Sequence, residues 1–180
     1  MQIHKILGCL GILLVISFQM KAQLAGPLKE GKTYMIIASH SNKALEIKSA
    51  PDITANGLQL QQNDSTAKIN QLFSFRQLKG GYYQITALCS NKSLEVRNNS
   101  VRDHDTIQQN QFNGHDCQMF ILVKNQSGTF NIINKNSGYG FDILGGNKAL
   151  GNGIAVIQYQ VYCAPNQSFR IVEVMPKQKL

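Results

Sequence analysis

The stretch NQSF, Asn166–Phe169, contains a Gln-x-Phe triplet that occurs three times in this 180-residue chain. The two earlier triplets are QLF at 71–73 and QMF at 118–120, so successive glutamines are 47 and 49 residues apart. Similar fragments at a nearly fixed period indicate an internal repeat, and a repeat constrains the architecture more strongly than any single element does.

Other positions keep the same spacing in the stretches 33–78, 82–123 and 129–174. The second residue of each stretch is aromatic, and twelve residues after it comes an acid between two apolar residues. A further Gln precedes the Gln of each triplet by nine residues. In chain order, the aromatic residues are Tyr34, Tyr83 and Phe130, the acids are Glu46, Glu95 and Asp142, and the further glutamines are Gln62, Gln109 and Gln158. The chain is therefore a threefold repeat.

Each repeat has the pattern of short β-strands. Apolar residues alternate with a period of two, as in YMI, LEI and FSF of the first repeat, which is typical of half-buried strands. Turn-forming segments such as SHSNK and GGNKALGNG separate them, and no helical period follows Ala22. Four short strands in each of three repeats predict an all-β fold, a β-trefoil with pseudo-threefold symmetry. Its six-stranded barrel is capped by three hairpins, and closing the barrel removes most exposed strand edges.

The first 22 residues have the order of a secretory signal peptide. A short basic start is followed by the apolar run ILGCLGILLVISF and a polar exit, and the run is too short to span a membrane comfortably. Cys9 lies at the start of the apolar run rather than after it, so we expect no lipid anchor and no membrane insertion. Cleavage after Ala22 would leave one domain, which we place at residues 28–175, in a secreted or periplasmic location.

Charge and cysteine content narrow the classes of partner. The formal net charge of +8 comes from scattered basic residues, and no Lys/Arg run interleaves with aromatic residues, so we expect no nucleic-acid partner. Three cysteines would remain after cleavage: Cys89, Cys117 and Cys163. Three thiols cannot all pair within one chain, so we expect one disulfide and one free thiol, with the pairing left open.

The pattern resembles the ricin-type β-trefoil lectins, and the resemblance covers essentially the whole mature chain. The hallmark of that family is a threefold Gln-x-Trp, preceded by a Leu-Asp-Val strand and a Val-Ile-Gln-Trp stretch. Here QLF, QMF and QSF replace the hallmark, LEI, LEV and FDI replace the strand, and NGIAVIQYQ corresponds to the last stretch. The chain has no Trp and lacks the family's common cysteine positions. In such a fold the Phe would fill the core, and the Gln amide would bond backbone groups where the repeat bends back.

The resemblance also implies a sugar site in each repeat. The acid of Leu-Asp-Val would accept hydrogen bonds from two adjacent hydroxyls, the aromatic residue would cover the sugar's apolar face, and the Asn before the hallmark Gln would complete the site. The third repeat holds the full set of Asp142, Tyr159, Asn166 and Gln167. The first holds a weaker set of Glu46, Asn63, Asn70 and Gln71.

We expect the second site to be lost, because Asn110 replaces the ring and Cys117 replaces the amide, although Glu95 remains. Structural roles are the alternative for the third repeat: Asp142 could cap a turn, Tyr159 could be a half-buried strand residue, and Asn166 could brace its hairpin.

Other constellations favour neither catalysis nor metal binding. RDHD at 102–105 and GHDC at 114–117 bring two histidines near acids and Cys117, which is a pattern for a metal site or a Cys–His pair. Alignment of the repeats places His104 and His115 in exposed loops, His104 in the loop that holds Gly57 in the first repeat. GNKALGN at 146–152 has Asn where a phosphate-binding loop needs Lys. No paired carboxylates or nucleophile–base set recurs, so we expect neither an enzyme nor a cofactor.

The sequence thus predicts a secreted, non-catalytic carbohydrate-binding module whose partner is a glycan or polysaccharide. The alternative is a trefoil interaction or inhibitor protein that binds another protein through its loops.

Overall fold

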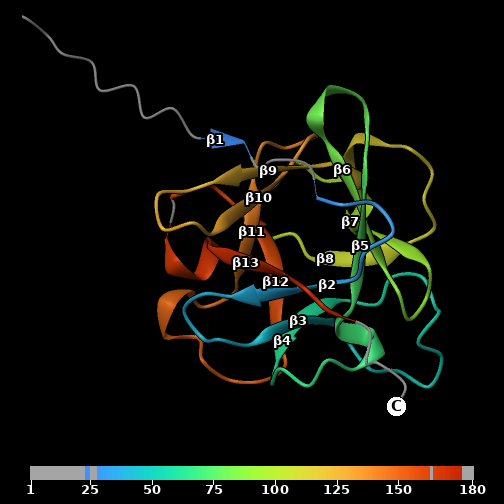
Figure 1. Ribbon diagram of the computed structural model, residues 1–180, viewed down its shortest axis with the longest axis horizontal. Helices are drawn as coiled ribbons and strands as arrows, with labels where there is room; N and C mark the ends of the chain where they lie inside the picture. The colour runs from blue at the N-terminus through green and yellow to red at the C-terminus, as the bar shows by residue number, and fades with distance from the viewer. Residues whose placement is uncertain (1–22, 25–27, 163, 176–180) are drawn as a thin grey trace, which may run out of the picture.

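The computed structural model describes residues 23–24, 28–162 and 164–175 (Figure 1). The predicted signal peptide, residues 1–22, and Cys163 lie outside the described residues. Within the predicted domain each repeat contributes four strands. They are β2 Tyr34–Ala38, β3 Ala44–Ile47, β4 Leu60–Asn63 and β5 Phe73–Gln77 in the first repeat; β6 Tyr83–Ala87, β7 Lys92–Val96, β8 Ile107–Asn110 and β9 Phe120–Lys124 in the second; and β10 Phe130–Asn134, β11 Gly140–Ile143, β12 Ile154–Tyr159 and β13 Phe169–Glu173 in the third.

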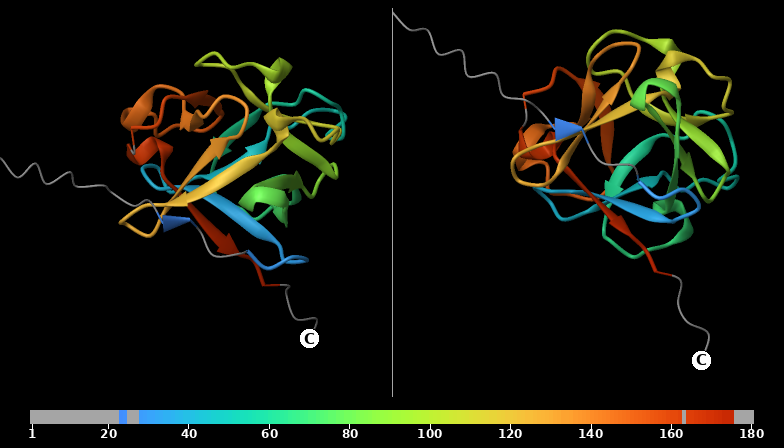
Figure 2. Two further views of the ribbon diagram at one scale, coloured as in Figure 1. Left: turned by 90° about the horizontal axis from the view of Figure 1, so that it is seen from above. Right: turned by 45° about the horizontal axis from the view of Figure 1, so that its top comes forward.

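The first and fourth strands of the three repeats close a barrel. Antiparallel pairing runs from β2 to β5, β6, β9, β10 and β13, and from β13 back to β2. The contacts that join β2 to β5, β6 to β9 and β10 to β13 are Tyr34 opposite Phe73, Tyr83 opposite Phe120, and Phe130 opposite Phe169. These pairs occupy equivalent places in the three repeats, so the predicted β-trefoil is confirmed. Figure 2 shows the three lobes around the pseudo-threefold axis.

The second and third strands form the hairpins that cap the barrel: β3–β4, β7–β8 and β11–β12. A turn with a left-handed residue leads into each hairpin, at Asn42, Asn91 and Gly138, where Asn and Gly tolerate positive φ better than other residues do. Short 3-10 helices occupy the bends, and those just before the fourth strands are η1 Ile69–Gln71, η4 Asp116–Gln118 and η6 Pro165–Gln167. These three helices contain the Gln of each triplet. A two-residue strand, β1 Gln23–Leu24, pairs with β9.

The core is built from the repeated apolar positions. Phe73, Phe120 and Phe169 are completely buried, as expected for the Phe of Gln-x-Phe. Phe141 takes the place of the leucines in the other repeats and packs edge-on between Phe120 and Phe169. Strand β2 departs from the half-buried pattern because it is buried on both faces. Its Met35 side packs outside the barrel core in a second, smaller apolar cluster.

Candidate functional site

A buried glutamine in each repeat holds a loop of the neighbouring repeat. The side-chain amide of Gln62 donates to the carbonyls of Ala149 and Gly151 at 2.7 and 2.8 Å. Gln109 donates in the same way to Ile53 and Ala55 of the first repeat. Gln158 donates to Ser100 and Arg102 of the second.

The carbonyl oxygens of these three glutamine side chains accept from Ser41, Ser90 and Ser137. The loop between the second and third strands of each repeat therefore lies over the hairpin of another repeat, and it borders that repeat's candidate site.

The third-repeat site forms where β11, the end of β12 and helix η6 meet. Asp142 lies in β11, Tyr159 ends β12, and Asn166 and Gln167 lie in η6. Asn166 Nδ2 donates to Asp142 Oδ1 at 2.9 Å, and Gln167 Nε2 donates to Asp142 Oδ2 at 2.8 Å. The structure thus brings both predicted amides onto the predicted acid.

Gln167 has an internal role as well as its contact with Asp142. Its side chain is 1% exposed, its Nε2 also donates to the Gln160 carbonyl, and its Oε1 accepts from the Tyr162 backbone N–H. Gln71 and Gln118 make the same kind of backbone contacts in their repeats. The predicted structural role of the Gln in Gln-x-Phe is therefore confirmed. The Gln167 amide is therefore bonded within the protein at both its nitrogen and its oxygen, and its contact with Asp142 orients that carboxylate.

Asn166 is 4% exposed and is held from two sides. Its backbone N–H donates to Asn147 Oδ1 at 3.0 Å, and its Nδ2 reaches the Ile143 carbonyl at 3.4 Å in addition to Asp142. Both hydrogens of the amide thus have acceptors. Asn166 Oδ1 makes no hydrogen bond to a described residue, so this oxygen is the group that Asn166 can offer to a hydroxyl donor.

Burial raises the pKa of the Asp142 carboxyl above its ordinary value of 3.8. The hydrogen bonds from Gln167 and Asn166 act in the opposite direction, as do the charges of His104 and His40. Desolvation disfavours the ionised form, whereas donors and positive charges favour it, and burial is the larger effect here. Asp142 is 7% exposed, so only a small part of the residue is accessible from outside.

The Tyr159 side chain stands partly exposed at the end of β12, next to two other rings. The His104 ring lies edge-on to it, with ring centroids 4.7 Å apart and planes at 75°. The Tyr162 ring lies 5.9 Å away on a tilted plane. Edge-on and tilted arrangements suit aromatic quadrupoles, and they hold the Tyr159 ring in place.

The first-repeat residues also converge, but their carboxylate is more fully bonded. Glu46 Oε1 accepts from Gln61 Nε2 at 2.9 Å and from Asn63 Nδ2 at 2.8 Å, and Glu46 Oε2 accepts from Gln71 Nε2 at 3.0 Å. Asn70 instead donates to the Ile47 carbonyl. The Asn at the aromatic position therefore binds the acid of its own repeat.

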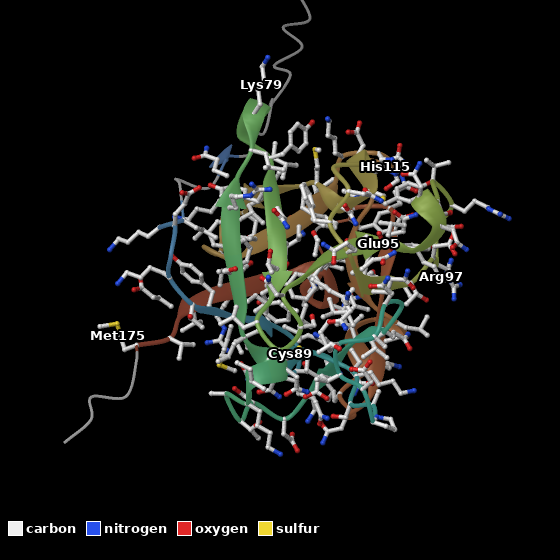
Figure 3. The ribbon with its side chains drawn as sticks, turned by 90° about the vertical axis from the view of Figure 1, so that its right-hand side faces the viewer. Lys79, Cys89, Glu95, Arg97, His115 and Met175 are labelled. Carbon is white, nitrogen blue, oxygen red and sulfur yellow. The ribbon has the colours of Figure 1, made fainter. Side chains whose placement is uncertain are left out.

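The second repeat has the same arrangement. Glu95 Oε1 accepts from Gln108 and Asn110, both at 2.8 Å, and Glu95 Oε2 accepts from Gln118 at 3.0 Å. Cys117 stands at the position of Asn166 and is 3% exposed. Figure 3 shows Glu95 inside the molecule, while Arg97 points outward beyond it.

A cavity of about 230 Å³ adjoins this acid, lined among others by Glu95, Gln108, Asn110, Asn113, His115 and Cys117. Its lining is mostly polar, and the His115 imidazole is its one aromatic ring, with no Phe, Tyr or Trp among the lining residues.

The cysteines do not pair as expected. Cys89 and Cys117 are both free thiols, so neither forms the predicted disulfide, while Cys163 lies outside the described residues. Burial and the nearby Glu95 carboxylate raise the pKa of Cys117 to about 11, and burial also raises the pKa of Cys89. Oxidation begins from the thiolate, and neither environment favours it.

His104 and His115 lie in exposed loops of the second repeat, as predicted. His104 is paired with Asp103 at 3.4 Å. Within the described part of the chain, no three His, Cys, Asp or Glu side chains gather as metal ligands would. In the same residues, no helix has the length and apolarity needed to cross a membrane.

Several contributors to the sites were missed from the sequence. Gln61 and Gln108 bind the acids, Asn147 braces Asn166, and His104 packs on Tyr159. The tripeptide Gln-Gln-Asn, which occurs at 61–63 and again at 108–110, was an available signal for the first pair. His104 and Tyr159 belong to different repeats, and no local sequence pattern predicts the contact between them.

Fold and site together define a trefoil of the lectin class: a six-stranded barrel with an outer hairpin that carries a carboxylate and a ring, next to a 3-10 helix that supplies two amides. The chain belongs to the family described as ricin-type beta-trefoil lectin domain-like, which matches residues 19–110, 69–159 and 116–177. The overlapping matches agree with the internal repeat. No curated protein sequence gives a significant match.

Solved structures show the same fold. The designed 3-fold symmetric protein ThreeFoil is 31% identical with a TM-score of 0.75, and the alignment covers 79% of this chain and 99% of that one. A ricin B-like lectin from Macrolepiota procera, solved in complex with lactose, is 15% identical with a TM-score of 0.66, over 82% and 99% of the two chains. An exo-beta-1,3-galactanase from Clostridium thermocellum is 21% identical with a TM-score of 0.75. There the alignment covers 83% of this chain but 32% of the galactanase.

Proposed function

We propose that the protein is a secreted, non-catalytic carbohydrate-binding domain that binds a glycan through its third repeat. The observation that carries this proposal is the difference in hydrogen bonding among the three acids. Asp142 accepts from two side-chain amides, whereas Glu46 and Glu95 each accept from three.

The number of donors matters because a sugar presents hydroxyls in adjacent pairs. An ionised carboxylate has about four acceptor sites, so Asp142 keeps about two for a pair of hydroxyls. Glu46 and Glu95 keep about one each. Hydrogen bonds to a charged acceptor are the strongest that such an open site can offer. The third repeat is therefore the best equipped to bind a diol.

The aromatic position supports the same choice. Tyr159 can cover the apolar C–H face of a sugar ring, while the equivalent Asn63 and Asn110 are turned onto their own acids. The sugars named with related structures provide probes: lactose for the Macrolepiota procera lectin and GalNAc for an earthworm R-type lectin, which is 18% identical with a TM-score of 0.61. We take lactose and GalNAc as the first ligands to test.

A shallow site of this kind buries little area, so we expect a dissociation constant of roughly millimolar to tens of micromolar. Tighter binding to a polysaccharide would need a second site or an oligomer. The first repeat, with Glu46, Asn63, Asn70 and Gln71, is the weaker candidate for that second site.

A glycan array followed by calorimetric titration tests the proposal. The mature chain should bind at least one class of glycan, and the titration should give one site per chain. A stoichiometry of two would mean that the first repeat also binds. An array without any ligand would contradict the proposal and favour a trefoil that binds protein partners through its loops.

Export is the remaining part of the proposal and is supported by the pattern of residues 1–22. The intact mass of the protein recovered outside the cytoplasm of a secreting host should correspond to cleavage close to Ala22. A protein that retains residues 1–22 would contradict it.

A further inference from the structure

One backbone position is equivalent in the three repeats and differs in its side chain. At this position the backbone N–H donates to the backbone carbonyl of a buried glutamine in the neighbouring repeat. The three pairs are Gly57 with Gln109 at 2.9 Å, His104 with Gln158 at 2.9 Å, and Gly153 with Gln62 at 2.8 Å. Gly57, His104 and Gly153 have φ angles of 79°, 62° and 74°. All three are left-handed, and two of them are glycine.

The left-handed region is costly for any residue with a Cβ atom and is essentially free for glycine. Histidine is among the residues that adopt it more often than most, but it is still strained there relative to glycine. A side chain at this position therefore gives the backbone no advantage. Backbone strain of this kind clusters at functional sites. The reason for a histidine at this position must therefore be found in the contacts of its side chain.

The His104 side chain contacts the third-repeat site. Its ring lies edge-on to Tyr159 at 4.7 Å, and its charge is one of the influences that lower the pKa of Asp142 against the effect of burial. Nδ1 is 3.4 Å from Asp103 Oδ2. Nε2 has no hydrogen-bond partner among the described residues, and the side chain is 58% exposed. An imidazole nitrogen beside the Tyr159 ring is thus available to a ligand.

The other repeats show the reverse combination. Gly57 and Gly153 border hairpins that end in Asn110 and Asn63, which carry no ring and bind their own acids. A Cβ atom would meet nothing within 4 Å at Gly153, and at Gly57 only the Gln108 side chain at 3.9 Å, so space does not explain the glycines. The histidine is found where the neighbouring hairpin, that of the third repeat, carries the Tyr159 ring.

We infer that His104, contributed by the second repeat, is a ligand-binding residue of the third-repeat glycan site. It holds the Tyr159 ring in the orientation that receives the sugar, and it presents Nε2 to a sugar hydroxyl. This inference rests on the function proposed above. The third-repeat site is then formed by residues of two repeats. At the sites of the first and second repeats the equivalent position is a glycine, which contributes no side chain.

The substitution His104→Gly tests the inference, because it restores the residue of the other two repeats. Lactose and GalNAc are titrated against wild type and variant by calorimetry, and unfolding by denaturant is measured in parallel. Affinity should fall about fivefold to tenfold, as expected for the loss of one hydrogen bond and of ring support. The midpoint of unfolding should stay the same or rise, since glycine relieves the backbone strain.

Two further variants make the result specific. His104→Asn keeps a residue that tolerates the left-handed region and offers an amide, so it should recover part of the affinity. His115→Ala removes the exposed histidine of the same repeat that does not touch Tyr159, and it should leave binding unchanged.

Equal affinity of wild type and His104→Gly would overturn this inference while the proposed function stands. A joint loss of affinity and stability in both His104 variants would show a purely structural role and would overturn it as well. If wild type binds neither probe nor any glycan on an array, the proposed function falls and the inference with it.

Discussion

Replacing Asp142 by Asn would remove one negative charge from the third-repeat site and keep its shape. The carboxylate offers about two free acceptor sites to adjacent hydroxyls, while the amide offers one uncharged oxygen. Hydrogen bonds to a charged group contribute about 1.5–3 kcal/mol each, against about 0.5–1.5 kcal/mol for neutral pairs. A loss of about 2–3 kcal/mol in binding free energy follows. It corresponds to roughly 30- to 150-fold in affinity, which takes a weak site beyond measurement.

The same substitution affects the free energy of unfolding. Asn166 Nδ2 and Gln167 Nε2 each donate to one oxygen of Asp142, so the new amide must turn its NH₂ group toward one of these donors. An unsatisfied buried group of this kind costs about 1–3 kcal/mol. Burial has raised the pKa of Asp142, so the ionised form is itself disfavoured in the fold, and the neutral amide recovers part of that cost. We expect a net destabilisation of about 1 kcal/mol.

Glu95→Gln is the matched control. Glu95 accepts from Gln108, Asn110 and Gln118, so the new amide meets the same conflict between donors and should destabilise the fold at least as much. Because the second repeat lacks the ring and the amide of the third, glycan binding should not change. Calorimetric titration and denaturant unfolding of both variants separate the two effects. The assignment of the third-repeat site would be refuted if the Asp142→Asn variant bound glycan as well as wild type. It would also be refuted if the Glu95→Gln variant lost binding.

Three more measurements test the structure. As the pH is lowered, glycan affinity should begin to fall at a pH above 3.8, because burial raises the pKa of Asp142 and only the ionised carboxylate accepts from both hydroxyls. A midpoint of this loss of affinity at or below pH 3.8 would contradict the prediction. Phe169→Ala should lower the free energy of unfolding by about 3–5 kcal/mol, since the ring is completely buried, and a loss under 1 kcal/mol in denaturant unfolding would show that it is not a core residue. Thiol titration of the unfolded, unreduced protein should find at least two reactive thiols per chain, from Cys89 and Cys117, and a lower count would contradict the free thiols of the structure.

The sequence by itself determined the architecture. The spacing of Gln-x-Phe, the acids and the further glutamines revealed the repeat, and the period of two with turn residues between indicated short strands. These signals are local, because alternation along a strand and turn chemistry act over a few residues. The same signals occur in all three repeats, so each repeat supports the assignment of the other two. Four strands in each of three repeats then left the closed trefoil as the compact solution. The convergence of Asp142, Asn166 and Gln167 was predicted from the resemblance to the ricin-type lectins, and the hydrogen bonds to Asp142 show it.

Only the tertiary structure decided how the three candidate sites differ. The sequence showed Asn63 and Asn110 as missing rings, and the fold shows that they bind Glu46 and Glu95 together with Gln61 and Gln108. It also places His104 of the second repeat against Tyr159 of the third, and it leaves Cys89 and Cys117 unpaired. Each of these outcomes depends on distances of a few ångströms between side chains from separate strands or repeats. Hydrogen bonds, ring contacts and disulfides form only at such short range, and residue spacing along the chain does not encode it.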